Sequence, residues 1–318
     1  MDRRDLKVIF MGTPDFAGTN LKALIDAGYN VRLALCQPDK PVGRKHILTA
    51  PPVKVLAQEN NIEVYQPDSL RTEEAFAKLS SYEPDLIVTA AYGKILPAAI
   101  LDLPKYGCIN CHGSLLPARR GASPVQRAIL EGDKVTGVTF MKMDVGMDTG
   151  DIIEKVEVTI DPNEHTESLM NRLAVASAEK LPDIIDRWVA GELTSTKQDD
   201  NLATACPPIR PEEGEFDWTQ DAAAIHNRVR ALSAWPGAFV LKEDKKLKVL
   251  DSEVADDATI PDELKDSEPG TVVKAKGENL IVKCGTGFLK IKEIQQPGGK
   301  RLNARDCAHN FTVGRPII

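Results

Sequence analysis

The chain has 318 residues, of which 42% are hydrophobic and 27% are charged, and its formal net charge is −7. This length allows two domains with their own cores, and the composition is that of a soluble globular protein. No apolar run of about 18 residues occurs, so no membrane span is expected, and the start of the chain lacks a signal-peptide pattern. We therefore expect a cytoplasmic protein without a membrane partner.

Short apolar runs alternate with helical patterns in the first half of the chain, which predicts βαβ units around a parallel sheet. Leu21, Leu24 and Ile25 lie on one helical face, and Gly28 marks the end of that helix. Residues 37–52 are rich in proline and basic residues and are expected to form a long exposed loop. Strands are expected at residues 8–11, 31–36, 85–91, 107–111 and 138–143.

The second half begins with a helical pattern from about residue 166 to residue 190, in which Pro182 is expected to kink or divide the helix. A polar segment with several prolines then indicates a linker, and a further helical pattern spans residues 225–232. Short alternating segments follow at residues 248–250, 271–273, 280–282 and 288–294, which predicts a small antiparallel β-barrel. The expected fold class is α/β, with domains at residues 1–193 and 212–318 and a linker at residues 194–211.

The segment CINCHGSLLP, residues 108–117, contains C-x-x-C-H, which as a bare pattern is the attachment motif of a c-type haem. Only Cys108 and Cys111 of the six cysteines are close in sequence, and no second C-x-x-C completes a four-cysteine zinc site. A redox pair normally opens a helix after a strand, whereas these cysteines lie within a predicted strand. We expect two small buried side chains, with neither haem nor metal.

Asn110 and His112 lie two residues apart at the end of that strand, so their side chains point the same way. Ligands of open parallel sheets bind beyond the carboxyl ends of the strands. An amide can donate to a developing oxyanion, and a histidine can exchange a proton near neutral pH. Asp148, in the glycine-rich turn DVGMDTGD, could orient a protonated His112 if the strands are neighbours. The pair alone does not establish a site, because a single histidine is more often structural.

The segments INCHGSLLPARRGASPVQRAI and MDVGMDTGDII together resemble the signature of the N10-formyltetrahydrofolate-dependent formyltransferases. The resemblance covers essentially the whole chain. It implies a Rossmann-like formyltransferase domain with a parallel-type sheet, followed by an OB-like β-barrel domain that binds tRNA. It also implies that Asn110, His112 and Asp148 are the catalytic residues and that N10-formyltetrahydrofolate is the co-substrate, without metal or haem.

The resemblance further implies which residues contact the folate. The segment after the catalytic strand matches the one that binds tetrahydrofolate in the family, and the loop after the preceding strand is expected to line the pteridine pocket. The residues concerned are Ser114, Leu115, Leu116 and Pro117 in the first segment, and Ala91, Tyr92 and Leu96 in the second.

The formyl acceptor is indicated by basic residues. The loop at residues 37–54 resembles the insertion of family members that act on initiator methionyl-tRNA, with Arg44 at the position of its key arginine and Lys45 beside it. Sugar-amine enzymes generally lack this loop. From residue 270 onward, nine lysines and arginines stand against three acidic residues, and Lys300 and Arg301 suit a phosphate backbone. A solvated basic face would give the same pattern.

The expected function is therefore formyl transfer to the α-amine of initiator Met-tRNA by a monomer, in bacterial or organellar-type translation. Two alternatives remain: a formyltransferase acting on a sugar-nucleotide amine, and an RNA-binding module without catalysis. One departure from the family pattern concerns residues 207–216, which are often lysine-rich in relatives that contact tRNA there. Here only Arg210 is basic in that segment.

Overall fold

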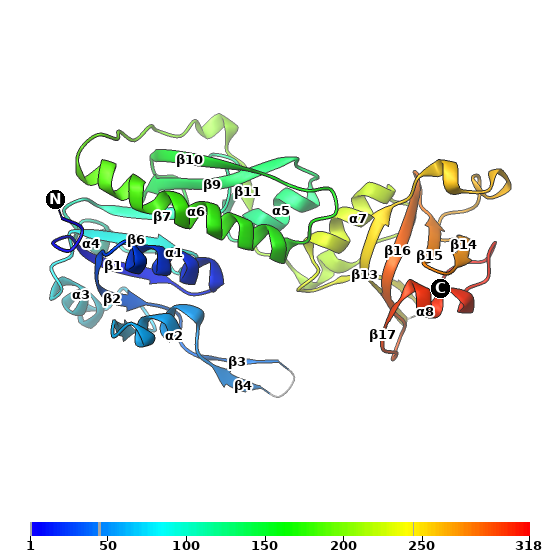
Figure 1. Cartoon of the computed structure of the whole chain (residues 1–318), viewed down its shortest axis with the longest axis horizontal. Coiled ribbons are helices and arrows are strands. Elements are labelled where there is room, and N and C mark those ends of the chain that lie inside the picture. Colours follow the sequence, from blue (N-terminus) through cyan, green and yellow to red (C-terminus); the bar gives the residue numbers. More distant parts are fainter. Residues whose placement is uncertain (1, 44–45, 244) are drawn as a thin grey trace. The chain divides into compact units, whose positions relative to one another are not determined.

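The structure is a computed structural model that describes residues 2–43, 46–243 and 245–318. It consists of two compact units, both visible in Figure 1. Unit 1 comprises Met1–Pro124, Val135–Thr159 and Met170–Pro207, and unit 2 comprises Val125–Lys134, Ile160–Leu169 and Pro208–Ile318. Two units are thus present as expected, while the predicted boundaries at residues 193 and 212 stay a prediction.

Unit 1 is built on a seven-stranded sheet in the order β10–β9–β7–β6–β1–β2–β5. Strands β7, β6, β1, β2 and β5 are parallel, whereas β9 pairs antiparallel with both of its neighbours, β7 and β10. The five strands expected in this half are confirmed. The edge strand β10 was missed because charged residues interrupt its apolar pattern. The bounds are β1 Lys7–Gly12, β2 Asn30–Leu35, β5 Glu63–Tyr65, β6 Leu86–Ala90, β7 Cys108–His112, β9 Val135–Lys142 and β10 Ile152–Thr159.

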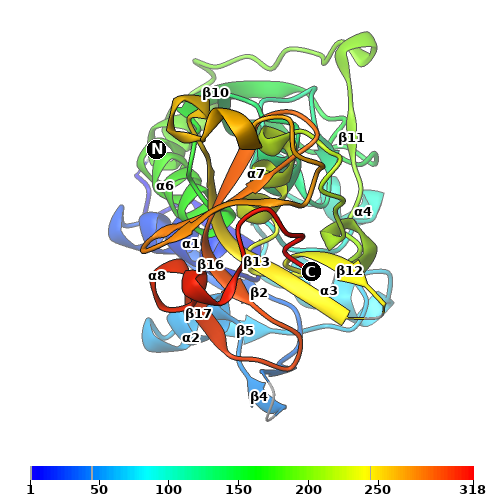
Figure 2. The same ribbon diagram turned by 90° about the vertical axis from the view of Figure 1, so that its right-hand side faces the viewer.

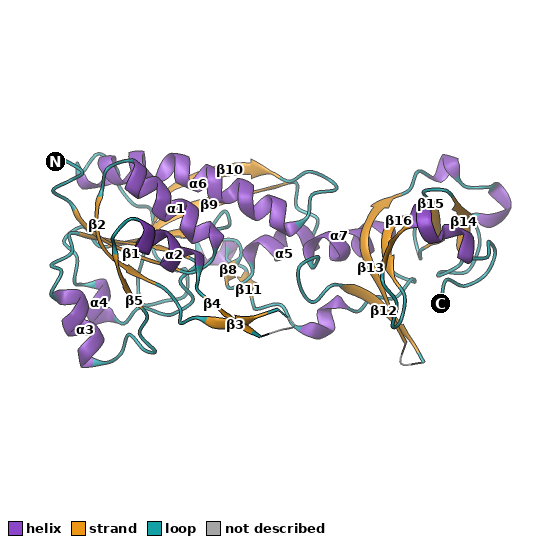
Figure 3. Cartoon of the chain, turned by 60° about the horizontal axis from the view of Figure 1, so that its bottom comes forward, coloured by secondary structure: helices purple, strands orange, loops and turns teal. Residues whose placement is uncertain are grey.

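Helices cover both faces of this sheet, as Figure 3 shows. Helices α1 (Asp15–Asp26) and α6 (Thr166–Val189) lie together on one face, where Ser177 Oγ donates to Asn20 Oδ1 at 2.7 Å. Helices α3 (Glu73–Ser80) and α4 (Ala98–Leu101) cover the other face. Pro182 lies inside α6, which is one continuous helix of 24 residues. Of the two expected effects, division of the helix is therefore wrong, and a kink stays a prediction.

The tyrosine at the start of β2 contacts α6 directly beyond this proline. Tyr29 is 6% exposed, and its hydroxyl lies 2.8 Å from Pro182 O and 2.6 Å from Asp186 Oδ1. These contacts fix the last turns of α6 against the sheet. No helix in the described ranges combines the length and apolar character that crossing a membrane requires.

Residues 37–52 contain a short hairpin in which β3 (Lys40–Val42) pairs antiparallel with β4 (Ile47–Thr49). The hairpin extends away from the sheet of unit 1 (Figures 1 and 3). Its apolar residues Ile47 and Leu48 are exposed. The predicted exposure is confirmed, but the prediction of a loop without strands is wrong, because a hairpin that buries neither face shows no apolar alternation. Helix α2 (Pro52–Glu59) follows.

Unit 2 holds an antiparallel sheet in the order β12–β13–β16–β15–β14, with β17 paired to β16. Figure 2 shows β12, β13, β16 and β17 of this sheet. Helix α7 (Ala222–Ala231) packs on β13 and β16, and its Ile225 and Val229 enter the main core of the unit. The expected antiparallel C-terminal domain is confirmed. The bounds are β12 Ala238–Lys242, β13 Lys245–Val254, β14 Val272–Lys276, β15 Asn279–Lys283, β16 Phe288–Gln295, β17 Arg301–Asn303 and α8 Ala304–Cys307.

An ion pair within unit 2 connects helix α5 (Pro124–Leu130) to the short helix Pro211–Gly214. Arg127 Nη2 donates to Glu213 Oε1 at 3.0 Å, and Arg127 Nη1 lies 2.5 Å from Oε2. The two side chains are 16% and 29% exposed. Glu213 Oε1 also accepts the backbone N–H of Arg210 at 2.8 Å. The hydrogen bond from Arg127, together with that from Arg210, holds the pKa of Glu213 below its ordinary value.

Glu213→Gln is expected to lower the free energy of unfolding by about 1–2 kcal/mol at pH 7, because it removes a charge-assisted bidentate contact. The folded-state pKa of Glu213 is lowered, so its stabilising contribution is present above the unfolded value of about 4.3 and is lost as the pH falls through the folded value. Urea unfolding of both proteins at decreasing pH measures this. The difference should shrink below about pH 4.

Glu212→Gln is the matched control, because Glu212 is the exposed neighbour in the same short helix. It should leave the free energy of unfolding nearly unchanged at every pH. A Glu213→Gln effect that did not vary with pH would contradict the ion pair as its source.

Candidate functional site

The end of β7 carries the residues on which the site is built. Strand β7 pairs in parallel with β6 and antiparallel with β9, so that Asn110 lies opposite Thr89 and His112 opposite Thr139. Because side chains alternate along a strand, Asn110 and His112 share one face and Cys111 points to the other. Asp148 is supplied by the turn between β9 and β10.

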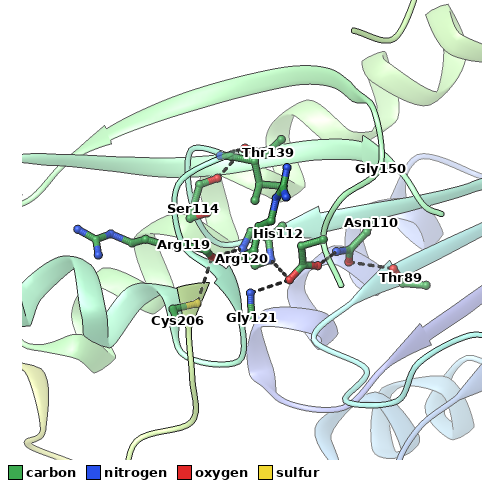
Figure 4. A network of polar contacts seen from close by, with 12 residues as sticks. Thr89, Asn110, His112, Ser114, Arg119, Arg120, Gly121, Thr139, Gly150 and Cys206 are labelled. Carbon is green, nitrogen blue, oxygen red and sulfur yellow. Dashed lines mark hydrogen bonds and ion pairs between the residues drawn. The ribbon is translucent and has the colours of Figure 1, made fainter. Parts of the chain in front are cut away.

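The Asp148 carboxylate lies between three nitrogen donors. Its Oδ2 accepts the Gly121 N–H at 2.9 Å and lies 3.6 Å from His112 Nδ1, while its Oδ1 is 3.5 Å from Asn110 Nδ2. Figure 4 shows Asn110, His112 and Gly121 gathered in this network. The side chains of His112 and Asp148 are 7% and 17% exposed. The structure thus brings together the three residues that the sequence nominated.

Both ring nitrogens of His112 face oxygen acceptors. Nε2 lies 3.0 Å from Arg119 O, and a backbone carbonyl can only accept, so Nε2 carries a hydrogen. Nδ1 faces the Asp148 carboxylate, which is also an acceptor. A second proton on Nδ1 satisfies that contact. The arrangement therefore suits an imidazolium whose charge is balanced by Asp148.

The Asn110 amide is oriented by its neighbour on β6. Thr89 Oγ1 donates to Asn110 Oδ1 at 2.9 Å, and Thr89 is 2% exposed. This hydrogen bond turns Nδ2 toward Asp148. An amide nitrogen carries two hydrogens, so Nδ2 can donate to a ligand as well as to the carboxylate.

Backbone conformation explains the glycines around Asp148. Asp148 itself has a φ of 54°, in the left-handed region. A Cβ at Gly150 would lie 1.9 Å from Lys142 O on β9, and a Cβ at Gly121 would lie 2.6 Å from Cys206 O. Only glycine permits both approaches. The turn DVGMDTGD therefore places the Asp148 carboxylate at the end of β7.

The segment predicted to bind folate follows β7 directly and has a fixed shape. Ser114 Oγ donates to Ala118 O at 2.8 Å, and Thr139 Oγ1 donates to Ser114 O at 2.6 Å. Leu116 N in turn donates to Thr139 Oγ1 at 3.0 Å, and the Leu116–Pro117 peptide bond is cis. Figure 4 shows Ser114 and Thr139 beside His112. Ser114, Leu115, Leu116 and Pro117 thus form a preformed turn next to the site.

Two of the three residues predicted in the second folate segment are buried. Ala91 is exposed with a φ of 44°, whereas Tyr92 and Leu96 belong to a core that includes Ile9 and Met11. Among the described residues no hydrogen-bond partner contacts the buried Tyr92 hydroxyl, and burial raises the pKa of Tyr92. Of these three side chains, Ala91 is the one on the surface.

The cysteines of C-x-x-C-H are buried strand residues, as interpreted from the sequence. Cys108 and Cys111 lie three residues apart on β7 and face opposite sides of the sheet. Burial raises the pKa of each thiol to about 12. No group of three His, Cys, Asp or Glu residues able to hold a metal ion occurs in the described ranges.

The basic residues predicted to bind tRNA have different environments. Arg44 and Lys45 lie outside the described residues. In unit 2, Lys300 is exposed, whereas Arg301 on β17 donates from Nε and Nη2 to Glu293 at 2.7 and 3.0 Å. Contact of these residues with nucleic acid stays a prediction.

Sequence reasoning missed the contacts of residues 196–206, which it placed within the linker at residues 194–211. β11 (Ala205–Cys206) pairs in parallel with β8 (Arg120–Gly121). Figure 4 shows Cys206 beside Arg119, with its Sγ 3.1 Å from Arg119 O. Gln198 is 5% exposed and reaches the turn of Asp148. These contacts attach residues 196–206 to the site, unlike those expected of a linker. The polar sequence TKQDDNLAT has no periodicity that indicates them.

Comparison with known proteins identifies the family. A formyl transferase family model matches residues 6–185, and a model of the formyl transferase C-terminal domain matches residues 208–312. Methionyl-tRNA formyltransferase of Geotalea uraniireducens is 45% identical over 308 residues, covering 97% of this chain and 96% of the relative. Methionyl-tRNA formyltransferase of Geobacter metallireducens is 43% identical over 301 residues, covering 95% and 94%.

The fold is also found among solved structures. WlaRD, a sugar 3N-formyltransferase solved with dTDP and 5-N-formyl-THF, superposes with a TM-score of 0.65 and 18% identity, covering 92% of this chain and 97% of that one. At this identity the likeness shows the fold alone. The two matching family models and the similarity over nearly the full length of the curated relatives show that the chain belongs to the formyl transferase family.

Proposed function

We propose that the chain transfers the formyl group of N10-formyltetrahydrofolate to the α-amine of initiator methionyl-tRNA, giving formyl-methionyl-tRNA for translation initiation. The observation that carries the proposal is the convergence of Asn110, His112 and Asp148 at the end of β7. The acceptor is supported by relatives named methionyl-tRNA formyltransferase, which are 43% and 45% identical over nearly the whole chain.

The reaction begins with attack of the amine on the formyl carbon. An α-amine with a pKa of about 7.7–8.0, lowered further by the aminoacyl ester, is substantially neutral near pH 7. Attack forms the new C–N bond and places negative charge on the formyl oxygen. Collapse of this intermediate breaks the bond to N10, and the proton lost by the amine replaces the formyl group on N10.

Asn110 and His112 are placed to stabilise the oxyanion. Their contacts with Asp148, at 3.5 and 3.6 Å, are longer than good hydrogen bonds. Both donors can therefore turn to the developing charge when substrate is present. Asp148 balances the imidazolium charge and, with His112 or a water molecule, relays the proton from the amine to N10.

The binding of the folate is assigned to the segments beside this site. The preformed turn of Ser114, Leu115, Leu116 and Pro117 lies next to His112 and provides one wall. Ala91 contributes to the facing loop from the surface. Tyr92 and Leu96 are buried, so they support this loop from the core.

The tRNA is proposed to contact Arg44 and Lys45, which the sequence places in the basic stretch at residues 37–54, and Lys300 and Arg301 of unit 2. We further propose that the protein acts as a cytoplasmic monomer. A sugar-nucleotide amine is the second candidate acceptor, because a sugar formyltransferase shares the fold. An RNA-binding module without catalysis is disfavoured by the intact arrangement of Asn110, His112 and Asp148.

Acceptor competition tests the function directly. With N10-formyltetrahydrofolate as donor, we expect formyl-methionyl-tRNA as the main product when initiator Met-tRNA, a UDP-amino-sugar and water are offered together. Product analysis by mass spectrometry and by radiolabelled formyl transfer measures the partition. Sugar formylation as the main reaction would support the second candidate acceptor, and bare hydrolysis would contradict both.

Asp148→Asn is expected to retain folate binding but to lower kcat by about 100- to 1000-fold, because the imidazolium of His112 loses its counter-charge. Folate affinity by calorimetry and single-turnover rates separate these effects. Asp144→Asn is the matched control in the same turn, since Asp144 Oδ1 accepts from Gly146 N and Thr149 Oγ1 and an amide oxygen can replace it. Near-full activity of Asp148→Asn would exclude the assigned role.

Lys300→Ala is expected to weaken tRNA binding and to reduce the slope of log Kd against log salt by about one. Arg301→Ala should change the slope less, because Glu293 already neutralises Arg301. Lys265→Ala serves as control in the same unit, since Lys265 pairs with Asp262 at 2.6 Å. Filter binding between low and physiological salt gives the slopes. An unchanged slope for Lys300→Ala would argue against a phosphate contact there.

A further inference from the structure

Gln198 is a buried amide whose hydrogen-bonding capacity is completely used. Its Nε2 donates to Asp148 O at 2.8 Å and to Gly150 O at 2.7 Å. Its Oε1 accepts from Arg120 Nε at 3.1 Å and from Arg120 Nη2 at 2.9 Å. Two carbonyls on one side and a guanidinium on the other allow the amide only one orientation. Gln198 is 5% exposed, so water does not replace these partners.

These contacts close a ring around the catalytic carboxylate. Arg120 and Gly121 are adjacent on β8, and the Gly121 N–H donates to Asp148 Oδ2. The backbone carbonyl of Asp148 accepts from Gln198 Nε2, and Gln198 Oε1 accepts from Arg120 Nη2. Strand β8 therefore holds the side chain of Asp148 directly through Gly121. It holds the backbone of Asp148 indirectly, through Arg120 and Gln198. Figure 4 shows Arg120 and Gly121 beside the network of His112 and Asn110.

The turn needs such support because Asp148 has a left-handed backbone. A non-glycine residue with a φ of 54° is less favourable than one in an ordinary conformation, because its Cβ comes close to the backbone. The carbonyls of Asp148 and Gly150 are the groups that would rotate if the turn relaxed. Gln198 holds both carbonyls at once, which opposes that rotation.

Neighbouring residues attach the same segment to the rest of the site. Thr196 exchanges two backbone hydrogen bonds with Ile152 of β10, both at 2.8 Å. Thr204 Oγ1 accepts the N–H of Arg119 at 2.8 Å, and Arg119 O contacts His112 Nε2. Gln198 thus lies on a segment that is anchored on both sides of the site.

We propose that Gln198 is a positioning residue for formyl transfer, which acts by holding the Asp148 carboxylate against His112 and Asn110 and touches no reacting atom. The proposal rests on the proposed function for its kinetic test only. A misplacement of a catalytic group by about 1 Å can cost about 100-fold in rate. Loss of Gln198 should therefore affect kcat more than substrate binding.

Gln198→Met keeps the length of the side chain and removes its hydrogen bonds. We expect kcat to fall by about 10- to 100-fold, with KM for donor and acceptor changed by less than about threefold. Tyr29→Phe is the control, because it removes a hydroxyl that contacts Pro182 O and Asp186 Oδ1 at the opposite ends of the strands, and it should lower the Tm without changing kcat. A kcat for Gln198→Met that fell no further than that of Tyr29→Phe would overturn the proposal.

A double-mutant cycle with Asp148→Asn separates positioning from general destabilisation. If Gln198 acts through Asp148, adding Gln198→Met to Asp148→Asn should lower kcat by less than about twofold further, while the loss of Tm persists. Fully multiplicative losses of kcat would overturn the proposal. If Gln198→Met does not fold, Gln198→Glu is the second variant, because it keeps an oxygen toward Arg120 but sets another against the carbonyls of Asp148 and Gly150.

A third readout does not depend on the reaction. The Gly121 amide proton donates to the Asp148 carboxylate, so its NMR chemical shift reports that contact in glycine-labelled protein. In Gln198→Met the shift should move toward its value in Asp148→Asn. An unmoved signal would overturn the positioning role. If wild-type protein formylates no acceptor, the proposed function fails, while this measurement still decides the role of Gln198.

Discussion

One carboxylate facing three nitrogen donors is the constraint on which the site depends. Asp148 reaches the Gly121 N–H, Asn110 Nδ2 and His112 Nδ1 together, within 2.9–3.6 Å. This is possible only if the turn after β9 folds back to the end of β7 with Asp148 in a left-handed conformation. The close approaches at Gly121 and Gly150 both serve that geometry, because any side chain there would meet backbone. The glycine-rich sequence of the turn is therefore a consequence of where the carboxylate must lie.

Strand periodicity in the sequence predicts one part of this site, the pair Asn110 and His112. Alternation along residues 108–112 places Asn110 and His112 on one face, and the rule for parallel sheets places them at the ligand edge. Periodicity does not show that Asp148 meets them, because that depends on the antiparallel pairing of β9 with β7. The resemblance to a family supplied that step. The structure then gave its physical basis.

What the sequence could not predict shares one property: its burial is decided by neighbours distant in the chain. Gln198 lies in a polar segment with no apolar pattern, yet four contacts from Arg120, Asp148 and Gly150 enclose it. The hairpin β3–β4 escaped prediction because its exposed strand β4 shows no alternation, and the edge strand β10 escaped because charged residues interrupt its apolar run. Regular elements with a buried face were predicted well, whereas the polar segment at residues 196–206 that supports the site was not.

Charge along the chain is a poor guide to charge on the surface for the same reason. The residues after 270 carry nine bases against three acids, which suggests a strongly basic tail. In the fold, Lys290 and Lys292 on β16 both contact Glu253 of the adjacent strand β13, at 2.8 and 3.1 Å. Arg301 is paired with Glu293. Strand pairing thus places Glu253, an acid from outside the tail, against two lysines of the tail. An anionic backbone would then be bound by the exposed lysines that remain, such as Lys300, rather than by the tail as a whole.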